Sequence, residues 1–403
     1  MATASPDWAG LPTEMVATVM GSLDIPDLFR AGCVCSSCAA TLYSATSGAT
    51  FRVRLPDPPL RSRALVGSAH GWLATADEAS SDLHLVNPLS GAQVALPPVA
   101  TLHHVESFLD GAAGSLVYSV QESEDDGPGE PPPVPVLYPA QKLRLFLYYK
   151  VVMSCSPAKG RHCVVLLLHR PDGELSFARV GDDRWTWITG QTLRSVRGYR
   201  DAIYNKIDGL FYVLSFDGSM ITLDLGGDGS SSSSSPVVAK DIMPLAMRWD
   251  DPIKDLMLTP SGDVLQVWRS KEIERFDTPV ELPAGVAHEF DDPYLSSRLD
   301  SFIHKVDIDK QHRELLTSIG DHALFLGYNS AVCLSTKDFP RLSPDSAYVA
   351  NVFDEEMWGN KHNLREIGIW DFKTETLRGL GEVQSRNPWL NWPAPIWITP
   401  SLH

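Results

Sequence analysis

Short apolar runs separated by polar turns dominate most of the chain, and the clearest example lies at residues 210–225. Two apolar stretches there flank Asp217-Gly218. An Asp-Gly pair in this position is typical of a two-residue type I′ turn, in which both central residues take positive φ. The pattern therefore predicts an antiparallel hairpin with Leu214 opposite Ile221. Apolar residues occupy much of both faces, so we expect this hairpin to be packed between two further sheets.

Similar strand-like runs recur through the body of the chain and fall into about six groups of three or four. Radially repeated four-stranded sheets suit such a series, because a ring leaves only short, protected sheet edges. We therefore predict a mainly β fold with a β-propeller of about six blades over residues 51–402, and a pair of stacked sandwiches is the alternative. The other predicted strands lie at residues 71–75, 83–87, 92–96, 143–153, 163–169, 175–180, 256–258, 264–268, 302–307, 314–319, 323–326, 331–335, 366–371 and 377–380.

Residues 7–48 show a helical periodicity instead. Met15, Val19 and Leu23 are spaced by four residues and share one face of a helix. Pro12 is suited to the first turn of this helix, where a missing N–H group costs nothing. The pattern predicts a first helix that begins near Leu11 and ends near Leu23.

A second and a third short helix are expected to follow. Asp24 is a good N-cap for the second, and Val34, Cys38 and Leu42 share a face of the third. A unit of about 40 residues has a marginal hydrophobic core when it stands alone. The three helices therefore need a partner, which is either the body of the same chain or another protein.

The apolar positions of this helical segment resemble a known docking motif, the F-box, by which receptors bind a Skp-type adaptor of cullin ubiquitin ligases. The match consists of Leu11-Pro12-x-Glu14, the spacing of Val19 and Leu23, Pro26-Asp27-Leu28, and Val34-Cys35. The resemblance implies a Skp-type adaptor, and through it a cullin, as partners. The side chains expected between the core of the head and the adaptor are Leu11, Pro12, Met15, Val19, Leu23, Leu28, Val34 and Cys35.

One position departs from the F-box pattern. The family usually has Trp where this chain has Cys38. A Trp buries about 150–250 Å², which is worth several kcal/mol, and a Cys recovers about a third of that. We therefore expect adaptor affinity to be weaker by about tenfold or more. The alternative for residues 7–48 is a helical cap that packs on the body and docks on nothing.

Three segments of the body resemble the F-box-associated propeller family of plants, which includes the KIB-type receptors. They are residues 71–99, 318–342 and 393–402, and the block at residues 320–327 is the most specific of them. This resemblance implies a propeller over residues 51–402, in agreement with the strand pattern.

Composition narrows the partners and the compartment. The formal net charge is −16, and an acidic chain repels phosphate backbones, so no nucleic-acid partner is expected. The first ten residues lack the pattern of a signal peptide, and no stretch approaches ~18 uncharged apolar residues, so no membrane span is expected. The six Cys are irregularly spaced and do not suggest a disulfide framework. We predict a reduced protein of the nucleus, the cytoplasm or both.

Candidate chemistry is sparse, since none of the common catalytic or phosphate-binding motifs occurs. Cys33, Cys35 and Cys38 lack the fourth ligand of a structural zinc site, and small core residues explain them better. His103 and His104 are adjacent, and adjacent side chains on a strand point to opposite faces, so they are not expected to share a metal. The expectation is a protein that is not an enzyme, with no catalytic residue, metal or cofactor.

The sequence thus favours a substrate-recognition subunit of a Skp–cullin–F-box ubiquitin ligase, in which the head docks on the adaptor and the propeller binds a target protein. One alternative is a protein-binding propeller with a degenerate, non-docking helical cap. Another is an enzymatic propeller, which needs convergent polar groups in its central channel. Two polar segments, residues 122–135 and 226–236, are predicted to be flexible loops.

Overall fold

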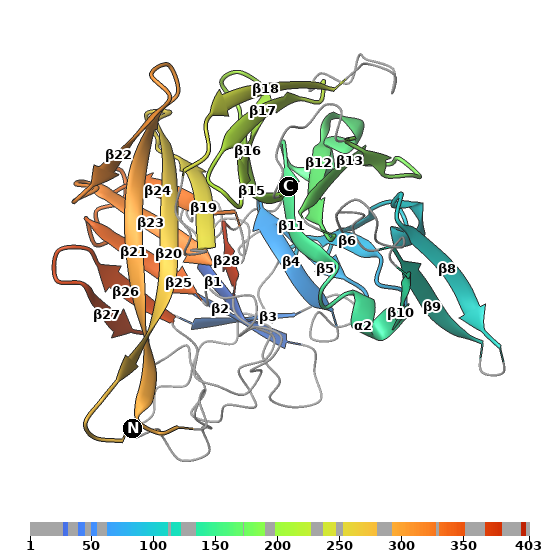
Figure 1. The fold of residues 1–403 in the computed structure, drawn as a ribbon, viewed down its shortest axis with the longest axis horizontal. Coiled ribbons are helices and arrows are strands. Elements are labelled where there is room, and N and C mark those ends of the chain that lie inside the picture. Colours follow the sequence, from blue (N-terminus) through green and yellow to red (C-terminus); the bar gives the residue numbers. More distant parts are fainter. Residues whose placement is uncertain are drawn as a thin grey trace.

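The computed structural model shows a mainly β protein in which sheets succeed one another around an axis (Figure 1). It describes residues 27–30, 39–44, 50–54, 63–111, 114–121, 134–171, 173–189, 198–226, 237–246, 253–279, 292–327, 330–350, 367–380 and 396–399. Within these residues no helix has the length and apolar character needed to cross a membrane. The two predicted flexible loops fall almost wholly outside the described ranges.

Six sheets of four or five strands make up the ring within the described residues. The strands of each sheet are given in order of pairing. The first sheet consists of β28 (Ile396–Ile398), β1 (Asp27–Arg30), β2 (Ala39–Tyr43) and β3 (Thr50–Arg54). The second sheet consists of β4 (Ala64–Ala69), β5 (Trp72–Ala76), β6 (Leu83–Val86) and β7 (Gln93–Ala95). The third sheet consists of β11 (Tyr148–Met153), β12 (Val164–His169), β13 (Glu174–Arg179) and β14 (Thr186–Trp187). The fourth sheet consists of β15 (Tyr199–Asn205), β16 (Leu210–Ser215), β17 (Met220–Asp224) and β18 (Val238–Met243). The fifth sheet consists of β19 (Ile253–Leu258), β20 (Val264–Arg275), β21 (Leu295–Asp307) and β22 (His312–Leu316). The sixth sheet consists of β24 (Val332–Ser335), β23 (His322–Gly327), β25 (Ser346–Ala350), β26 (Ile367–Asp371) and β27 (Thr376–Gly379).

The first strands of successive sheets are neighbours around the axis. β28 lies against β4, β4 against β11, β11 against β15, and β15 against β19, while β24 and β23 complete the circuit between β19 and β28. This circuit is a propeller-like arrangement with six sheets, as the strand pattern predicted.

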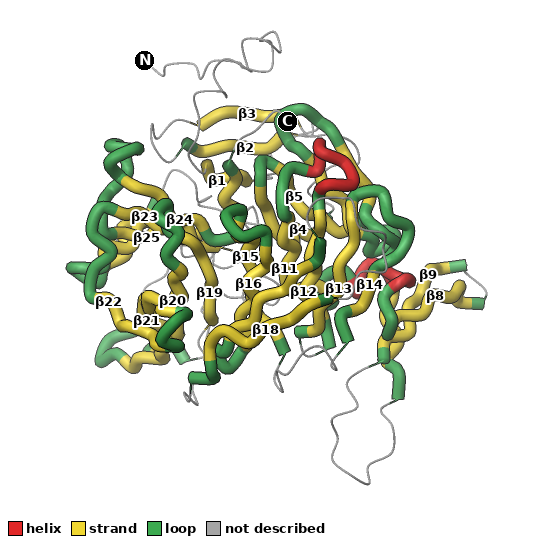
Figure 2. Tube along the Cα trace, turned by 90° about the horizontal axis from the view of Figure 1, so that it is seen from above, coloured by secondary structure: helices red, strands yellow, loops and turns green. Residues whose placement is uncertain are grey.

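A smaller sheet is attached outside the ring. It pairs β8 (Val105–Asp110), β9 (Ser115–Val120) and β10 (Val136–Pro139), and β8 and β9 extend away from the ring in both views (Figures 1 and 2). Three short helices complete the described elements: η3 (Val99–Thr101), α2 (Ala140–Leu143) and η4 (Pro157–His162).

The first sheet joins the two ends of the chain and corrects the prediction for the head. β28 pairs with β1, so that Leu28 lies opposite Trp397, and β1 pairs with β2. The second and third helices expected here are therefore wrong over residues 27–30 and 39–43, which form strands. Closing the ring needs strands beside β28, and this non-local demand outweighs the local helical pattern. The predicted first helix lies outside the described residues.

Trp397 ties this closing sheet to the sheets on both sides. The side chain is 1% exposed, and its Nε1–H donates to the carbonyl oxygen of Leu326 at 3.0 Å. Its ring stands edge-on to Phe325, with centroids 5.2 Å apart. On the other side, the hydroxyl of Ser68 on β4 donates to the carbonyl oxygen of Trp397. One residue of β28 thus contacts both neighbouring sheets.

The hairpin at residues 210–225 forms, but its register differs by one residue from the prediction. Val213, not Leu214, lies opposite Ile221. The loop has three residues rather than two, because the Gly218 N–H donates to the Ser215 carbonyl oxygen at 3.0 Å and Gly218 alone takes positive φ, at 84°. A contact with the residue before β15 helps to fix the conformation of this loop, since the hydroxyl of Ser215 donates to the carbonyl oxygen of Gly198 at 2.6 Å.

Burial on both faces of this hairpin is confirmed. Phe211 and Leu223 belong to an apolar cluster shared with β11 and β12. Tyr212 and Met220 belong to a second cluster shared with β19 and β20. The sheet is therefore packed between two others, which is the reason that its strands are apolar on both faces.

A buried ion pair joins three first strands of the ring. Lys150 on β11 pairs with Asp201 on β15, and their side chains are 9% and 2% exposed. Asp201 also accepts a hydrogen bond of 2.8 Å from the backbone N–H of Leu256 on β19. Burial raises the pKa of the Asp201 carboxyl, and the charge of Lys150 partly counteracts this. The carboxylate therefore holds neighbouring sheets in register near the axis.

Replacing Trp397 tests its part in closure. We expect Trp397→Ala to lower the free energy of unfolding by about 3–5 kcal/mol, as for other large buried side chains. Trp397→Phe should cost about 1–3 kcal/mol, because it leaves the buried Leu326 carbonyl oxygen without its donor. Urea titration measures both. Trp187→Phe, at a site 39% exposed, is the control and should change stability by less than about 0.5 kcal/mol. Equal effects at the two sites would contradict this account of closure.

Separating the buried charges should be costly. Asp201→Asn or Lys150→Met leaves one charge buried without its partner, so each should lower unfolding free energy by about 3–5 kcal/mol. The double variant Lys150→Met/Asp201→Leu should lose less than the sum of the single variants, because no lone charge remains. Asp307→Asn breaks an exposed pair with Lys310 and should leave the urea midpoint nearly unchanged. Additive losses in the double variant would show that the pair is not coupled.

Candidate binding site at the ring axis

A cavity of about 350 Å³ lies where the first strands of all six sheets meet. β4, β11, β15, β19 and β28 each bring the residues at or just after their carboxyl end, whereas β24 brings its beginning. One residue in or directly after each strand illustrates this composition: His70, Met153, Tyr204, Leu258, Cys333 and Thr399. The cavity is therefore a product of the ring and belongs to no single sheet.

His70 is placed at this cavity by a tight turn between β4 and β5. His70 and Gly71 both take positive φ, at 52° and 81°, between the paired residues Ala69 and Trp72. These features are those of a type I′ turn, the turn that the sequence predicted for Asp217-Gly218. His70 is thus held in a conformation that most side chains avoid, at the point where β4 ends.

The polar groups of the cavity include one ring nitrogen and one ammonium group. The Nε2 atom of His70 lies 3.2 Å from the carbonyl oxygen of Met153, to which it donates. Burial lowers the pKa of His70, and the positive charge of Lys206 lowers it further. His70 is therefore neutral at pH 7, and its Nδ1 atom is an acceptor. Lys206, also on the cavity wall, supplies a positive charge.

Most of the residues that line the wall are apolar, among them Val152, Ile203 and Leu258. A volume near 350 Å³ is at the lower end of ligand pockets, which span about 300–1,000 Å³. Such a cavity can take one or two side chains of a protein segment or a small molecule. The ammonium group of Lys206 favours an occupant with negative charge.

The adaptor-binding residues predicted from the sequence are not brought together in the described part of the chain. Leu28 lies in β1, within the closing sheet. The other seven lie outside the described residues: Leu11, Pro12, Met15, Val19, Leu23, Val34 and Cys35. Cys38 also lies outside them, directly before β2.

The cavity residues were not selected by sequence reasoning. What these residues share is their position, because most of them lie at the end of the first strand of a sheet. That signal becomes visible only when the strand groups are arranged as a ring, since the residues are separated by tens of positions along the chain.

Comparison with known proteins gives the family. Residues 42–371 match the sequence profile described as the KIB1-4 beta-propeller. The chain belongs to this family. The matched region begins within β2 and ends at the last residue of β26, so it contains most of the ring. No curated protein matches the chain.

Three solved structures show a distant resemblance to this KIB1-4 propeller. A puromycin-hydrolyzing peptidase of Mycobacterium tuberculosis is 11% identical with a TM-score of 0.30, over 65% of this chain and 33% of the peptidase. The Cps50 (Swd1) β-propeller domain of Myceliophteria thermophila is also 11% identical with a TM-score of 0.30, over 72% of this chain and 88% of that domain. A virginiamycin B lyase of Staphylococcus aureus is 10% identical with a TM-score of 0.30, over 73% and 85%. The KIB1-4 propeller thus spans about a third of the peptidase, and these similarities carry no argument about function.

Proposed function

We propose that this KIB1-4 propeller is the target-binding subunit of a Skp–cullin–F-box ubiquitin ligase, and that it is not itself an enzyme. The observation that carries the first half of the proposal is the axial cavity, to which all six sheets contribute. A ring of sheets holds such a surface rigidly, and rigid presentation lowers the entropic cost of binding. Partner proteins of the ligase supply the chemistry, and the propeller supplies effective concentration and orientation.

The chemistry of the cavity favours a protein target with an exposed acidic side chain. The wall is largely apolar, and Lys206 places a positive charge on it. The chain as a whole has a formal net charge of −16. A cationic site on an acidic molecule attracts an acidic group locally, while the remaining surface repels acidic proteins that do not fit.

Support for adaptor docking comes from residues 11–23, whose apolar spacing matches the first helix of an F-box and which precede β1. Residues 27–30 and 39–43 cannot belong to docking helices while they are paired in the closing sheet. Pairing of β1 with β28 therefore favours a second candidate function, a protein-binding propeller whose N-terminal segment does not dock. The two candidates differ in what residues 1–26 do.

Deletion of residues 1–26 separates the two functions, since it keeps β1. If the protein is a ligase subunit, the full chain should co-purify with a Skp-type adaptor and the truncated chain should not. The melting temperature of the truncated chain should stay within a few degrees of that of the full chain. Thermal melting and pull-down with purified adaptor measure the two effects. Failure of the full, folded chain to bind the adaptor would leave the second candidate function.

Charge reversal at the cavity tests target binding. We expect Lys206→Glu to reduce the recovery of bound target proteins by about tenfold or more, because a like charge then faces the acidic group of the target. Quantitative mass spectrometry of captured and ubiquitinated proteins measures this loss. Lys240→Glu changes an exposed lysine on β18 of the same sheet and should leave recovery unchanged. Equal recovery with both variants would exclude the cavity as the target site.

A further inference from the structure

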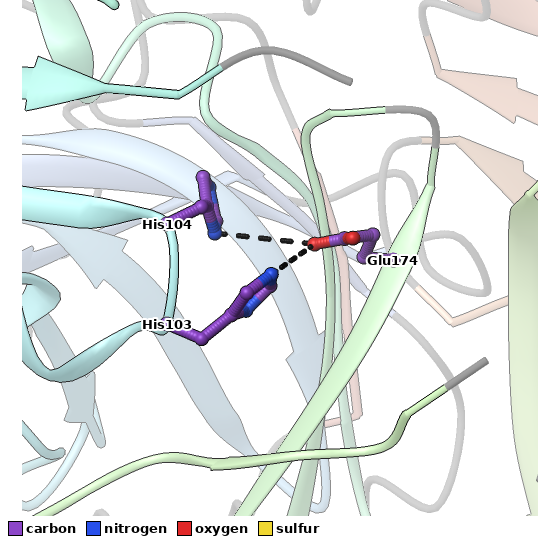
Figure 3. Close-up of side chains that lie close together, drawn as sticks. All are labelled: His103, His104 and Glu174. Atoms are coloured by element: carbon purple, nitrogen blue, oxygen red, sulfur yellow. Dashed lines mark ion pairs between the residues drawn. The ribbon is translucent and has the colours of Figure 1, made fainter. Parts of the chain in front are cut away.

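A second cluster of polar side chains lies away from the axis, between the segment that follows η3 and the start of β13. His103 and His104 come from that segment, and Glu174 is the first residue of β13 (Figure 3). Their ligand atoms all lie within 4.8 Å of one another. The Nε2 atom of His103 is 3.2 Å from Glu174 Oε2, and the Nδ1 atom of His104 is 3.9 Å from the same oxygen.

The sequence-based assumption that these two histidines lie on a strand and point to opposite faces is wrong. His103 and His104 lie in a turn between η3 and β8, which begins only at Val105. The alternation of a strand therefore does not apply, and both rings approach Glu174 from one side, as Figure 3 shows.

His104 is buried among groups that do not satisfy it. Its side chain is 4% exposed, and neither ring nitrogen makes a hydrogen bond of good geometry. Glu174 Oε2 is likewise buried, and although His103 Nε2 lies 3.2 Å away, the oxygen accepts no hydrogen bond of good geometry. Burial, together with the nearby rings of His169 and His103, lowers the pKa of His104 to about 2. Buried polar atoms of this kind are normally paired, because an unpaired one costs about 1–3 kcal/mol.

The neighbouring rings hold the two histidines in place. His103 stacks on Trp187, with centroids 3.7 Å apart and planes at 9°. His104 stacks on His169, with centroids 5.0 Å apart and planes at 6°. His169 is itself fully engaged, because its Nδ1 donates to the Arg170 carbonyl oxygen at 2.6 Å and its Nε2 accepts from the Ser176 hydroxyl at 2.9 Å. His169 therefore orients His104 and offers no free nitrogen.

Glu174 is positioned by the turn before it. Gly173 takes φ of 73°, and its carbonyl oxygen accepts from the Tyr199 N–H at 2.8 Å. A Cβ atom at residue 173 would lie 2.3 Å from the Tyr199 carbonyl oxygen, so only glycine fits against β15 here. This contact places β13 so that Glu174 begins the strand facing the two histidines.

A simple ion pair leaves the cluster incomplete. Protonation of His103 would satisfy one oxygen of Glu174, yet neither nitrogen of His104 would gain a hydrogen bond of good geometry. A divalent cation satisfies one nitrogen of each histidine and the carboxylate together. Two imidazoles and one carboxylate are the donor set of zinc sites with three protein ligands and an open fourth position.

We propose that His103, His104 and Glu174 bind one zinc ion. Zinc–nitrogen and zinc–oxygen bonds are about 2.0–2.2 Å long, which places tetrahedral ligands about 3.3–3.5 Å apart. Zinc binding requires rotation of the His103 and Glu174 side chains, each 26% exposed, to bring separations of up to 4.8 Å to these values. The bound ion joins the segment before β8 to β13, and its fourth position is open to water or to a donor atom of a bound partner.

The test is zinc binding by the full chain after removal of metal with a chelator. Isothermal titration and elemental analysis should give one zinc ion per chain. Glu174→Gln and His103→Asn should each raise the dissociation constant by at least ~10-fold, the lower end of the cost of losing even an outer-shell partner. Thermal melting of the metal-free variants checks that they are folded. Glu314→Gln, at an exposed position on β22, is the matched control and should bind zinc as the unchanged chain does.

Cobalt substitution separates this site from the cysteines at positions 33, 35 and 38. Bound at His103, His104 and Glu174, cobalt should show visible absorption without a thiolate charge-transfer band, and both variants should lose that absorption. Three outcomes would overturn the proposal: no zinc bound by the unchanged chain, undiminished affinity in Glu174→Gln and His103→Asn, or a thiolate band that both variants retain.

Discussion

Pairing of β28 with β1 is the constraint on which the rest of the structure depends. A ring of sheets has no free ends only if the last sheet contacts the first, and here the two ends of the chain share one sheet. Trp397 makes that closure specific, because its indole N–H reaches β23 while its carbonyl oxygen accepts a hydrogen bond from β4. Without this joint, β4 and β23 would each expose an apolar face to water.

Closure also determines where function can be located. The axial cavity exists because strands from all six sheets converge on one point, and the buried pair of Lys150 and Asp201 fixes three of those strands relative to one another. The same closure holds residues 27–30 in a strand beside β28, where the F-box resemblance predicted a helix.

The histidine cluster shows how a site can arise where a ring sheet meets an added element. β13 belongs to the ring, whereas His103 and His104 lie on the segment that leads into the attached sheet of β8, β9 and β10. Neither part alone has three ligand atoms close together. Stacking on Trp187 and His169 orients the imidazole rings, so contacts within the protein bring them toward Glu174.

Local patterns in the sequence were sufficient for many of the strands, for a ring of about six sheets, and for the burial of both faces of the 210–225 hairpin, but not for β4, β15 or the attached sheet of β8, β9 and β10. Strand periodicity and turn residues act over a few positions, which is why they can be read from the chain. The type I′ turn was assigned to the wrong site, because Ser215 is tied to Gly198 on the adjacent strand, a contact that no local pattern shows. Only the tertiary structure decided that residues 27–30 and 39–43 are strands, that the axial cavity has its particular lining, and that His103 and His104 face one carboxylate. Each of these depends on segments that are far apart in the chain and meet only when the ring closes.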